Sequence, residues 1–139
     1  MGNKKVFSKR IITFALILFS FVYVNAQTFR CNDIRFTYYA KTLGDKEIQK
    51  TKNAVLDSTL DMKFFANDVK VTMKSSTVDE VETAIYEKIS DTIYELYGKD
   101  RRRFVLKLRK VLDFINGCEM TVYHNDKEVC TAIYERVYF

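Results

Sequence analysis

The feature that most restricts the fold of this chain is the alternation of apolar and polar side chains in several short segments. Apolar residues occupy every second position over 60–64 and again over 69–73, and the turn 66–68, Ala-Asn-Asp, separates the two runs. A period of two places the apolar side chains of a strand on one face of a sheet. The segment 59–74 is therefore predicted to form a β-hairpin.

The same period recurs along the rest of the chain. Further strands are predicted over 33–42, 104–109, 119–123 and 129–137, the last two joined by a turn at 125–127. After residue 26 the chain contains eleven Thr, ten Val and seven Ile against five Ala. Because β-branched residues favour a pleated, half-buried surface, composition and pattern together indicate a predominantly antiparallel β domain.

Two stretches also fit a helix. Apolar residues over 77–97 fall at helical spacing behind a capping box at Thr77–Glu80, and Gly98 follows as a stop signal. A second helical stripe covers 101–116. The Ile, Thr and Tyr content of 83–97 fits two strands equally well. An α+β fold with helices near 77–97 and 101–116 is therefore the alternative to an all-β fold.

Several segments carry a resemblance to a known family: QTFRCNDI at 27–34, IYELY at 93–97 with FVLKL at 104–108, MTVY at 120–123 and TAIY at 131–134. They resemble a family of short, uncharacterised exported proteins of Bacteroidota-type bacteria. The resemblance implies an all-β meander in which each helical-looking stretch consists of strands, and it implies no assigned activity. We therefore expect an antiparallel meander of about seven or eight strands, closed as a small barrel or packed as a sandwich.

The first 26 residues have the pattern of a secretory signal peptide. Four basic residues precede an uncharged, mostly apolar run over 11–24, and cleavage is predicted between Ala26 and Gln27. Fourteen helical residues span roughly 21 Å, which is short of a hydrocarbon core of about 30 Å. We expect residues 27–139 to be one domain exported to the periplasm or the exterior, with only the leader meeting the membrane.

Removal of the leader would change the charge of the chain. The full sequence has 23 Lys and Arg against 18 Asp and Glu, and four of the basic residues but none of the acids lie in residues 1–26. The remaining domain has a net charge of +1. The overall basic balance therefore does not indicate nucleic-acid binding, which needs a basic face on the mature domain.

Three cysteines follow the leader, so export would allow one disulfide and leave one thiol over. Cys118 and Cys130 flank the last predicted hairpin but lie roughly 10 Å apart along it, which is too far for a bond. In a closed meander the first and last strands are neighbours, which favours a bond between Cys31 and Cys130. Three reduced, buried thiols are the alternative. Because there is no CxxC pair and His124 is the one histidine, no metal or other cofactor is predicted.

The concentrated basic patch of the chain consists of five residues, Arg101, Arg102, Arg103, Lys107 and Arg109. On a strand, Arg103, Lys107 and Arg109 share one face. That face suits an anionic partner, such as lipopolysaccharide phosphates, an acidic glycan or an acidic protein. A solvated outer face opposite the apolar row is the simpler interpretation.

No catalytic signature stands out, so we expect a non-catalytic binding module of a bacterial envelope that recognises a protein, a glycan or a small apolar ligand. The aromatic residues spread over the strands would fill the core or line an apolar site. One alternative is a small outer-membrane barrel, because the chain ends in Val137-Tyr138-Phe139. Another is a small secreted enzyme that pairs His124 with Cys118 or Cys130 as a thiol nucleophile.

Overall fold

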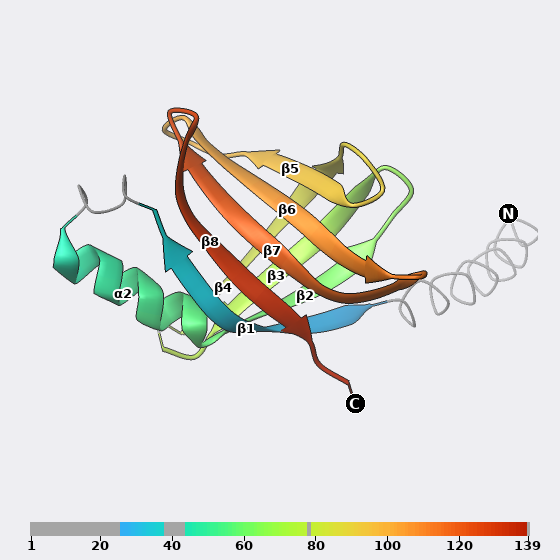
Figure 1. Cartoon of the computed structure of the whole chain (residues 1–139), viewed down its shortest axis with the longest axis horizontal. Coiled ribbons are helices and arrows are strands. Elements are labelled where there is room, and N and C mark those ends of the chain that lie inside the picture. Colours follow the sequence, from blue (N-terminus) through green and yellow to red (C-terminus); the bar gives the residue numbers. More distant parts are fainter. Residues whose placement is uncertain (1–25, 38–43, 78, 139) are drawn as a thin grey trace, which may run out of the picture.

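A computed structural model describes residues 26–37, 44–77 and 79–138, and in it the chain forms a closed antiparallel β-barrel (Figure 1). Each strand pairs with the next in sequence, and the last strand pairs with the first. The elements are β1 (Gln27–Phe36), α2 (Asp45–Leu56), β2 (Ser58–Phe64), β3 (Asp68–Ser75), β4 (Glu80–Lys88), β5 (Ile93–Tyr97), β6 (Arg102–Val111), β7 (Phe114–His124) and β8 (Lys127–Arg136). The predicted all-β meander is confirmed, in its barrel form.

The alternative with helices near 77–97 and 101–116 is wrong, because these stretches form β4, β5 and β6. The first helix prediction was based on a stripe of apolar residues, and most of that stripe lies on the outside of the barrel. There Val81, Ile85 and Ile89 are 65%, 58% and 57% exposed. The residues that β4 and β5 bury are Tyr86 and Tyr94. The apparent helical spacing therefore arose from outward-facing side chains of β4 together with one side chain of the turn that follows it.

Two elements, the first strand and a helix, also differ from the prediction. The first strand begins at Gln27 and ends at Phe36, whereas the sequence pattern placed it at 33–42, of which 38–42 lies outside the described residues. The helix α2 was not predicted at all. Its segment is rich in Lys, Glu and Gln, and Ile48, Thr51 and Val55 stand three and four residues apart on its inner side.

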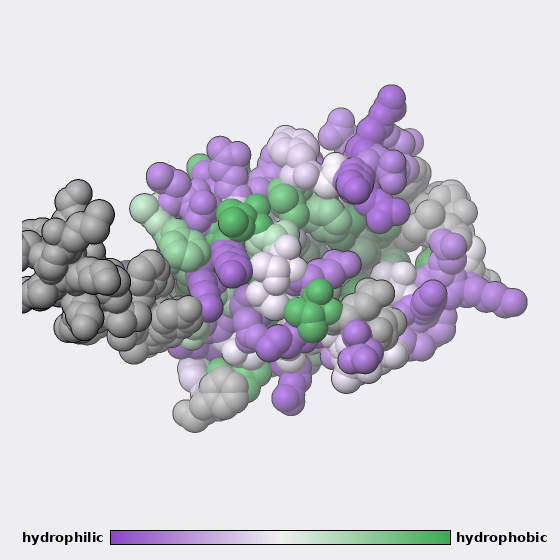
Figure 2. Space-filling view, turned by 180° about the vertical axis from the view of Figure 1, so that it is seen from behind, coloured by the Kyte–Doolittle hydropathy of each residue, from purple (hydrophilic) through white to green (hydrophobic). Residues whose placement is uncertain are grey.

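The barrel is apolar inside and largely polar outside. Outward positions of β2 and β3 carry Lys63, Lys70 and Lys74, while the alternate residues of the same strands face the core. Figure 2 shows one face of this exterior, where apolar side chains are scattered among hydrophilic ones. Among the described residues, no helix is both long and apolar enough to cross a membrane.

The two ends of the barrel differ in packing. At the end where β1, β3, β5 and β7 begin, the interior is filled, and Phe29, Met62 and Leu106 are fully buried. The rings of Phe64 and Tyr94 meet edge to face there, with centroids 6.1 Å apart. At the opposite end, α2 connects β1 to β2 beside the barrel opening (Figure 1). The candidate site lies in this second half.

Candidate functional site

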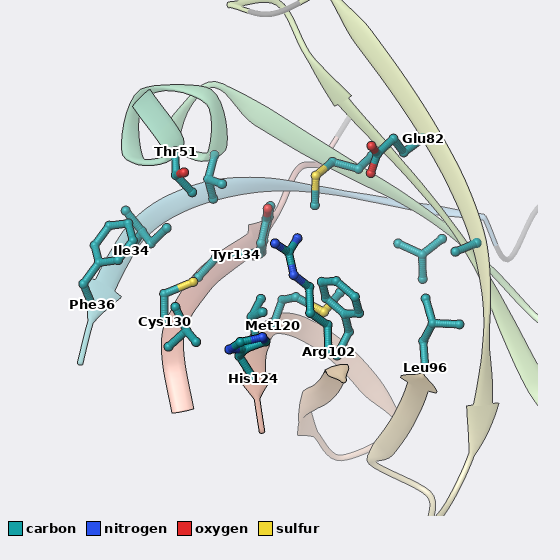
Figure 3. Close-up of a pocket in the computed structure, with 18 of the residues that line it drawn as sticks. Ile34, Phe36, Thr51, Glu82, Leu96, Arg102, Met120, His124, Cys130 and Tyr134 are labelled. Atoms are coloured by element: carbon teal, nitrogen blue, oxygen red, sulfur yellow. The ribbon is translucent and has the colours of Figure 1, made fainter. Parts of the chain in front are cut away.

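A cavity of about 480 Å³ occupies the half of the barrel next to α2 (Figure 3). Its volume lies within the range of about 300–1,000 Å³ that is typical of small-molecule sites. The inner rows of several strands supply its mostly apolar wall, including Ile34, Met73, Ala84, Phe104, Met120 and Val122. The helix closes one side with Ile48 and Val55.

Small side chains at two inward positions help to explain why this half of the barrel is hollow. Ala84 on β4 and Ala132 on β8 both line the cavity. An eight-stranded barrel is just wide enough for large side chains to fill its interior. In the opposite half of the barrel, aromatic and branched side chains fill the interior. Alanine at these two positions leaves the corresponding volume empty in this half.

The C-terminal turn of α2 is fastened to the barrel by two buried serines that are register partners on β2 and β3. Ser58 donates a hydrogen bond to the carbonyl oxygen of Val55 over 2.5 Å, and Ser75 donates to that of Ala54 over 2.8 Å. The last carbonyl groups of a helix have no partner within the helix, so these bonds satisfy them. At the other end of α2, Gly44 provides no side-chain cap. The helix is therefore held most firmly at its C-terminal end.

Charged and polar side chains gather where the cavity meets solvent. Arg102 and His124 are register partners on β6 and β7 and both line the cavity, as do Glu82 on β4 and Glu47 on α2. Figure 3 shows the Arg102 side chain directed inward from the start of β6, among the residues of the wall. Among the described residues, the Arg102 guanidinium forms no ion pair. An apolar cavity with polar groups at one end can hold an amphipathic molecule.

The barrel is closed, but one of its strand pairs is short beside the cavity. The strands β4 and β5 pair only at Glu87↔Glu95 and Lys88↔Tyr94, whereas β4 pairs with β3 from Asp68↔Glu87 to Ser75↔Glu80. Cavity residues of β4 lie beyond the short paired stretch with β5. Beside the cavity, β4 is therefore joined to β5 by fewer backbone pairs than to β3.

The predicted basic patch divides between the inside and the outside of the barrel. Arg103 faces outward, where its guanidinium lies 3.4 Å from a carboxylate oxygen of Glu95 and 4.4 Å from the ring centroid of Tyr123. Lys107 and Arg109 are exposed on the same outer row, and Arg109 donates a hydrogen bond to Asn116. Arg101 lies in the turn before β6, and Arg102 alone lines the cavity. The patch is therefore not one surface.

The three cysteines are free and buried, so the predicted bond between Cys31 and Cys130 is corrected. The strands β1 and β8 are neighbours as expected, but Cys31 lies opposite Tyr134, whereas Cys130 lies opposite Phe36. Four residues along a strand cover roughly 13 Å. Because bonded cysteines have Cα atoms less than about 7 Å apart, this register does not allow the bond.

Burial makes these thiols poor nucleophiles. It raises the pKa values of Cys31 and Cys130 from 9.0 to about 11, and it also raises the pKa of Cys118. A thiol reacts as the thiolate, which is scarce at neutral pH for such pKa values. Although Cys130 and His124 both line the cavity, this environment gives the thiol–histidine interpretation no support. Among the described residues, no cluster of three or more His, Cys, Asp or Glu is placed to hold a metal ion.

Two further findings concern the identity of the chain. The predicted leader falls almost entirely outside the described residues, and β1 begins at Gln27, directly after the predicted cleavage site. Comparison of the sequence with protein-family models and with curated proteins finds no match. The resemblance to short exported proteins therefore stays a prediction.

Proposed function

We propose that residues 27–139 form a non-catalytic, exported binding module of a bacterial envelope that holds one small apolar or amphipathic ligand inside its barrel. The observation that carries this proposal is the cavity of about 480 Å³ beside α2. Removing apolar ligand surface from water contributes roughly 25 cal/mol per Å², so an apolar cavity of this size provides a driving force for binding without further chemistry.

The distribution of polarity supports a ligand-binding barrel over the outer-membrane alternative. Barrels that span a membrane present an apolar band to lipid and enclose a polar interior. Here the interior of the barrel is apolar, and charged side chains such as Lys70 and Lys74 point outward. Eight-stranded barrels of this polarity can hold a small ligand between their strands.

The export part of the proposal rests on the N-terminal sequence. A basic start, an apolar run over 11–24 and small residues before Gln27 form the expected order of a cleaved leader. Every described strand lies after that cleavage site. The mature chain would therefore keep the whole barrel and its cavity.

A matched pair of substitutions on β4 tests whether the cavity binds ligands. Ala84 faces the cavity, whereas its neighbour Thr83 is exposed on the outer row. Ala84→Phe should fill the cavity and weaken binding of a neutral apolar probe, such as decanol, by at least about tenfold, which corresponds to about 1.4 kcal/mol. Thr83→Phe, which adds the same ring on the outside, should leave calorimetric binding unchanged. Equal affinities for the two variants, or no binding to the unaltered protein, contradict the proposal.

A further inference from the structure

We infer that the ligand is an amphipathic acid whose apolar chain lies in the cavity and whose carboxylate pairs with Arg102. This inference rests on the proposed function and deepens it by assigning the head group. The position of Arg102 carries it, because a cation at the start of β6 points inward at the solvent end of a mostly apolar cavity (Figure 3).

The guanidinium of Arg102 is available for a ligand. No ion pair joins it to another side chain of the described residues, and the side chain is exposed to solvent. Arginine presents its N–H donors in a planar fork that matches both oxygens of a carboxylate. The next arginine along the strand is already engaged, since Arg103 pairs with Glu95 on the outer face. Of the basic patch, Arg102 is thus the member placed to meet a cavity ligand.

The turns near Arg102 carry charges of both signs. His124 is the register partner of Arg102, and Lys127 is in turn a register partner of His124. The turn before β6 adds Arg101 and Lys99 next to Asp100, and the turn before β8 places Asp126 next to Lys127. Among the described residues that line the cavity, Arg102 is the one lysine or arginine, so its guanidinium is the fixed positive charge there that an anionic head group can meet.

Two acids at the opening suggest a competing assignment, in which the head group of the ligand is cationic. Glu82 on β4 and Glu47 on α2 also line the cavity and are exposed. They could instead receive the head group of an amine. A guanidinium is more weakly hydrated than an ammonium, so a pair between Arg102 and a carboxylate loses less hydration than an ammonium head placed at Glu82. We therefore assign the head group to Arg102 and use an amine to test the assignment.

The size of the cavity suits a single medium-length chain. At about 30 Å³ per non-hydrogen atom, which is the share of a water molecule in the liquid, the cavity has room for about sixteen such atoms. Decanoate, with about twelve non-hydrogen atoms, fits this volume with its head at the opening. Decanol and decylamine have the same chain with a neutral and a cationic head.

Calorimetric titration of the full mature chain with these three compounds, below the concentrations at which they form micelles, tests the inference. Decanoate should bind more tightly than decylamine. Arg102→Met should weaken decanoate at least about tenfold, the loss of a charge-assisted pair, and change decanol by less than about threefold. Lys107→Met, which removes a cation from the outer row of the same strand, should change neither. Arg102→Lys should restore part of the decanoate affinity, because it keeps the charge but not the fork.

The outcomes separate the two proposals. If none of the three compounds binds the unaltered protein, the proposed function fails. If decanol binds as tightly as decanoate, or if Arg102→Met weakens both equally, the cavity binds ligands but the head-group assignment is overturned. Tighter binding of decylamine than of decanoate overturns it as well. Should Arg102→Met not fold, the comparison of the three compounds on the unaltered protein still decides.

Discussion

The hydroxyl oxygens of Tyr134 and Ser58 lie 2.8 Å apart in the buried interior, where they join the last strand of the barrel to the residue that starts β2. Because Ser58 donates its own proton to the carbonyl oxygen of Val55, the Tyr134 hydroxyl is the donor of this pair. One chain of hydrogen bonds thus links β8, β2 and the end of α2. Tyr134 also lines the cavity, so the wall of the site and the anchor of the helix share a residue.

Tyr134→Phe should lower the free energy of unfolding by about 1 kcal/mol, because it removes one buried hydrogen bond and leaves Ser58 without its donor. Tyr94→Phe is the matched control. Tyr94 is also buried, but within the described residues no hydrogen bond involves its hydroxyl group. Urea unfolding of both variants measures the difference. Equal losses for the two variants would mean that the Tyr134 hydroxyl has no special role in anchoring the helix.

The stability of the fold should fall as the pH rises from 9 toward 11. Burial raises the pKa values of Cys31 and Cys130 from 9.0 to about 11. Between these values the thiols are ionised in the unfolded chain and protonated in the barrel, so the unfolded chain binds fewer protons and gains stability with pH. The stabilisation is complete below pH 9 and is lost as the pH passes 11.

Urea titrations at pH 8, 8.5, 9 and 9.5 measure this loss where the tyrosines, whose ordinary pKa is 10.0, contribute little. Burial also raises the pKa values of Tyr86 and Tyr134 from 10.0, which adds a loss of the same sign above pH 10. Cys130→Ala should reduce the pH dependence over this range without abolishing it, because the buried thiols of Cys31 and Cys118 remain. A free energy of unfolding that stays constant or rises over this range contradicts the buried, unpaired state of the thiols.

Ligand binding should protect Cys130 from a small neutral thiol reagent such as methyl methanethiosulfonate. Cys130 lines the cavity and is 7% exposed, whereas Cys118 is 1% exposed and does not line it. Peptide mapping by mass spectrometry should show that Cys130 reacts faster than Cys118 and that decanol slows only Cys130. If saturating decanol leaves the rate at Cys130 unchanged, the ligand does not occupy the cavity.

Expression of the full chain in a Gram-negative host should yield a protein that begins at Gln27 in the periplasmic or extracellular fraction. Intact mass spectrometry of each fraction locates the first residue. Replacing two residues of the apolar run, Leu16→Arg and Leu18→Arg, should keep the uncleaved chain in the cytoplasm, because a signal peptide needs an uninterrupted apolar core. Recovery of the unaltered chain with residues 1–26 intact contradicts the predicted cleavage.

The strand prediction succeeded where a strand faces the packed interior. The hairpin over 59–74 was found because Leu60, Met62 and Val71 alternate without interruption and all of them are buried. The prediction became ambiguous on β4, where the inner row carries Glu82 and Ala84 and the outer row carries Val81 and Ile85. These inner residues line the cavity, so the pattern weakens where the candidate site replaces the core.

The candidate site itself was not accessible to sequence reasoning. In the sequence, Arg102 groups with Arg101 and Arg103 in one basic patch. The sequence alone does not show that the side chain of Arg102 faces the inside of the barrel at its opening. The bond between Cys31 and Cys130 failed because sequence does not fix the register between distant strands. The register of β1 against β8 also shifts between Cys31 and Asp33, which moves every later residue of β1 by one position. The helical pattern of α2, by contrast, is present in the sequence, where Ile48, Thr51 and Val55 are spaced three and four residues apart.

Nuclear Overhauser contacts between bound decanol and the methyl groups of the protein test the central claim most directly. We expect contacts from the chain of decanol to Ala84, Ala132 and Met120, which line the cavity, and none to Val81 and Ile85 on the outside of β4. Contacts confined to Val81 and Ile85 would contradict the account, because they would place the ligand on the outer surface and leave the barrel interior empty.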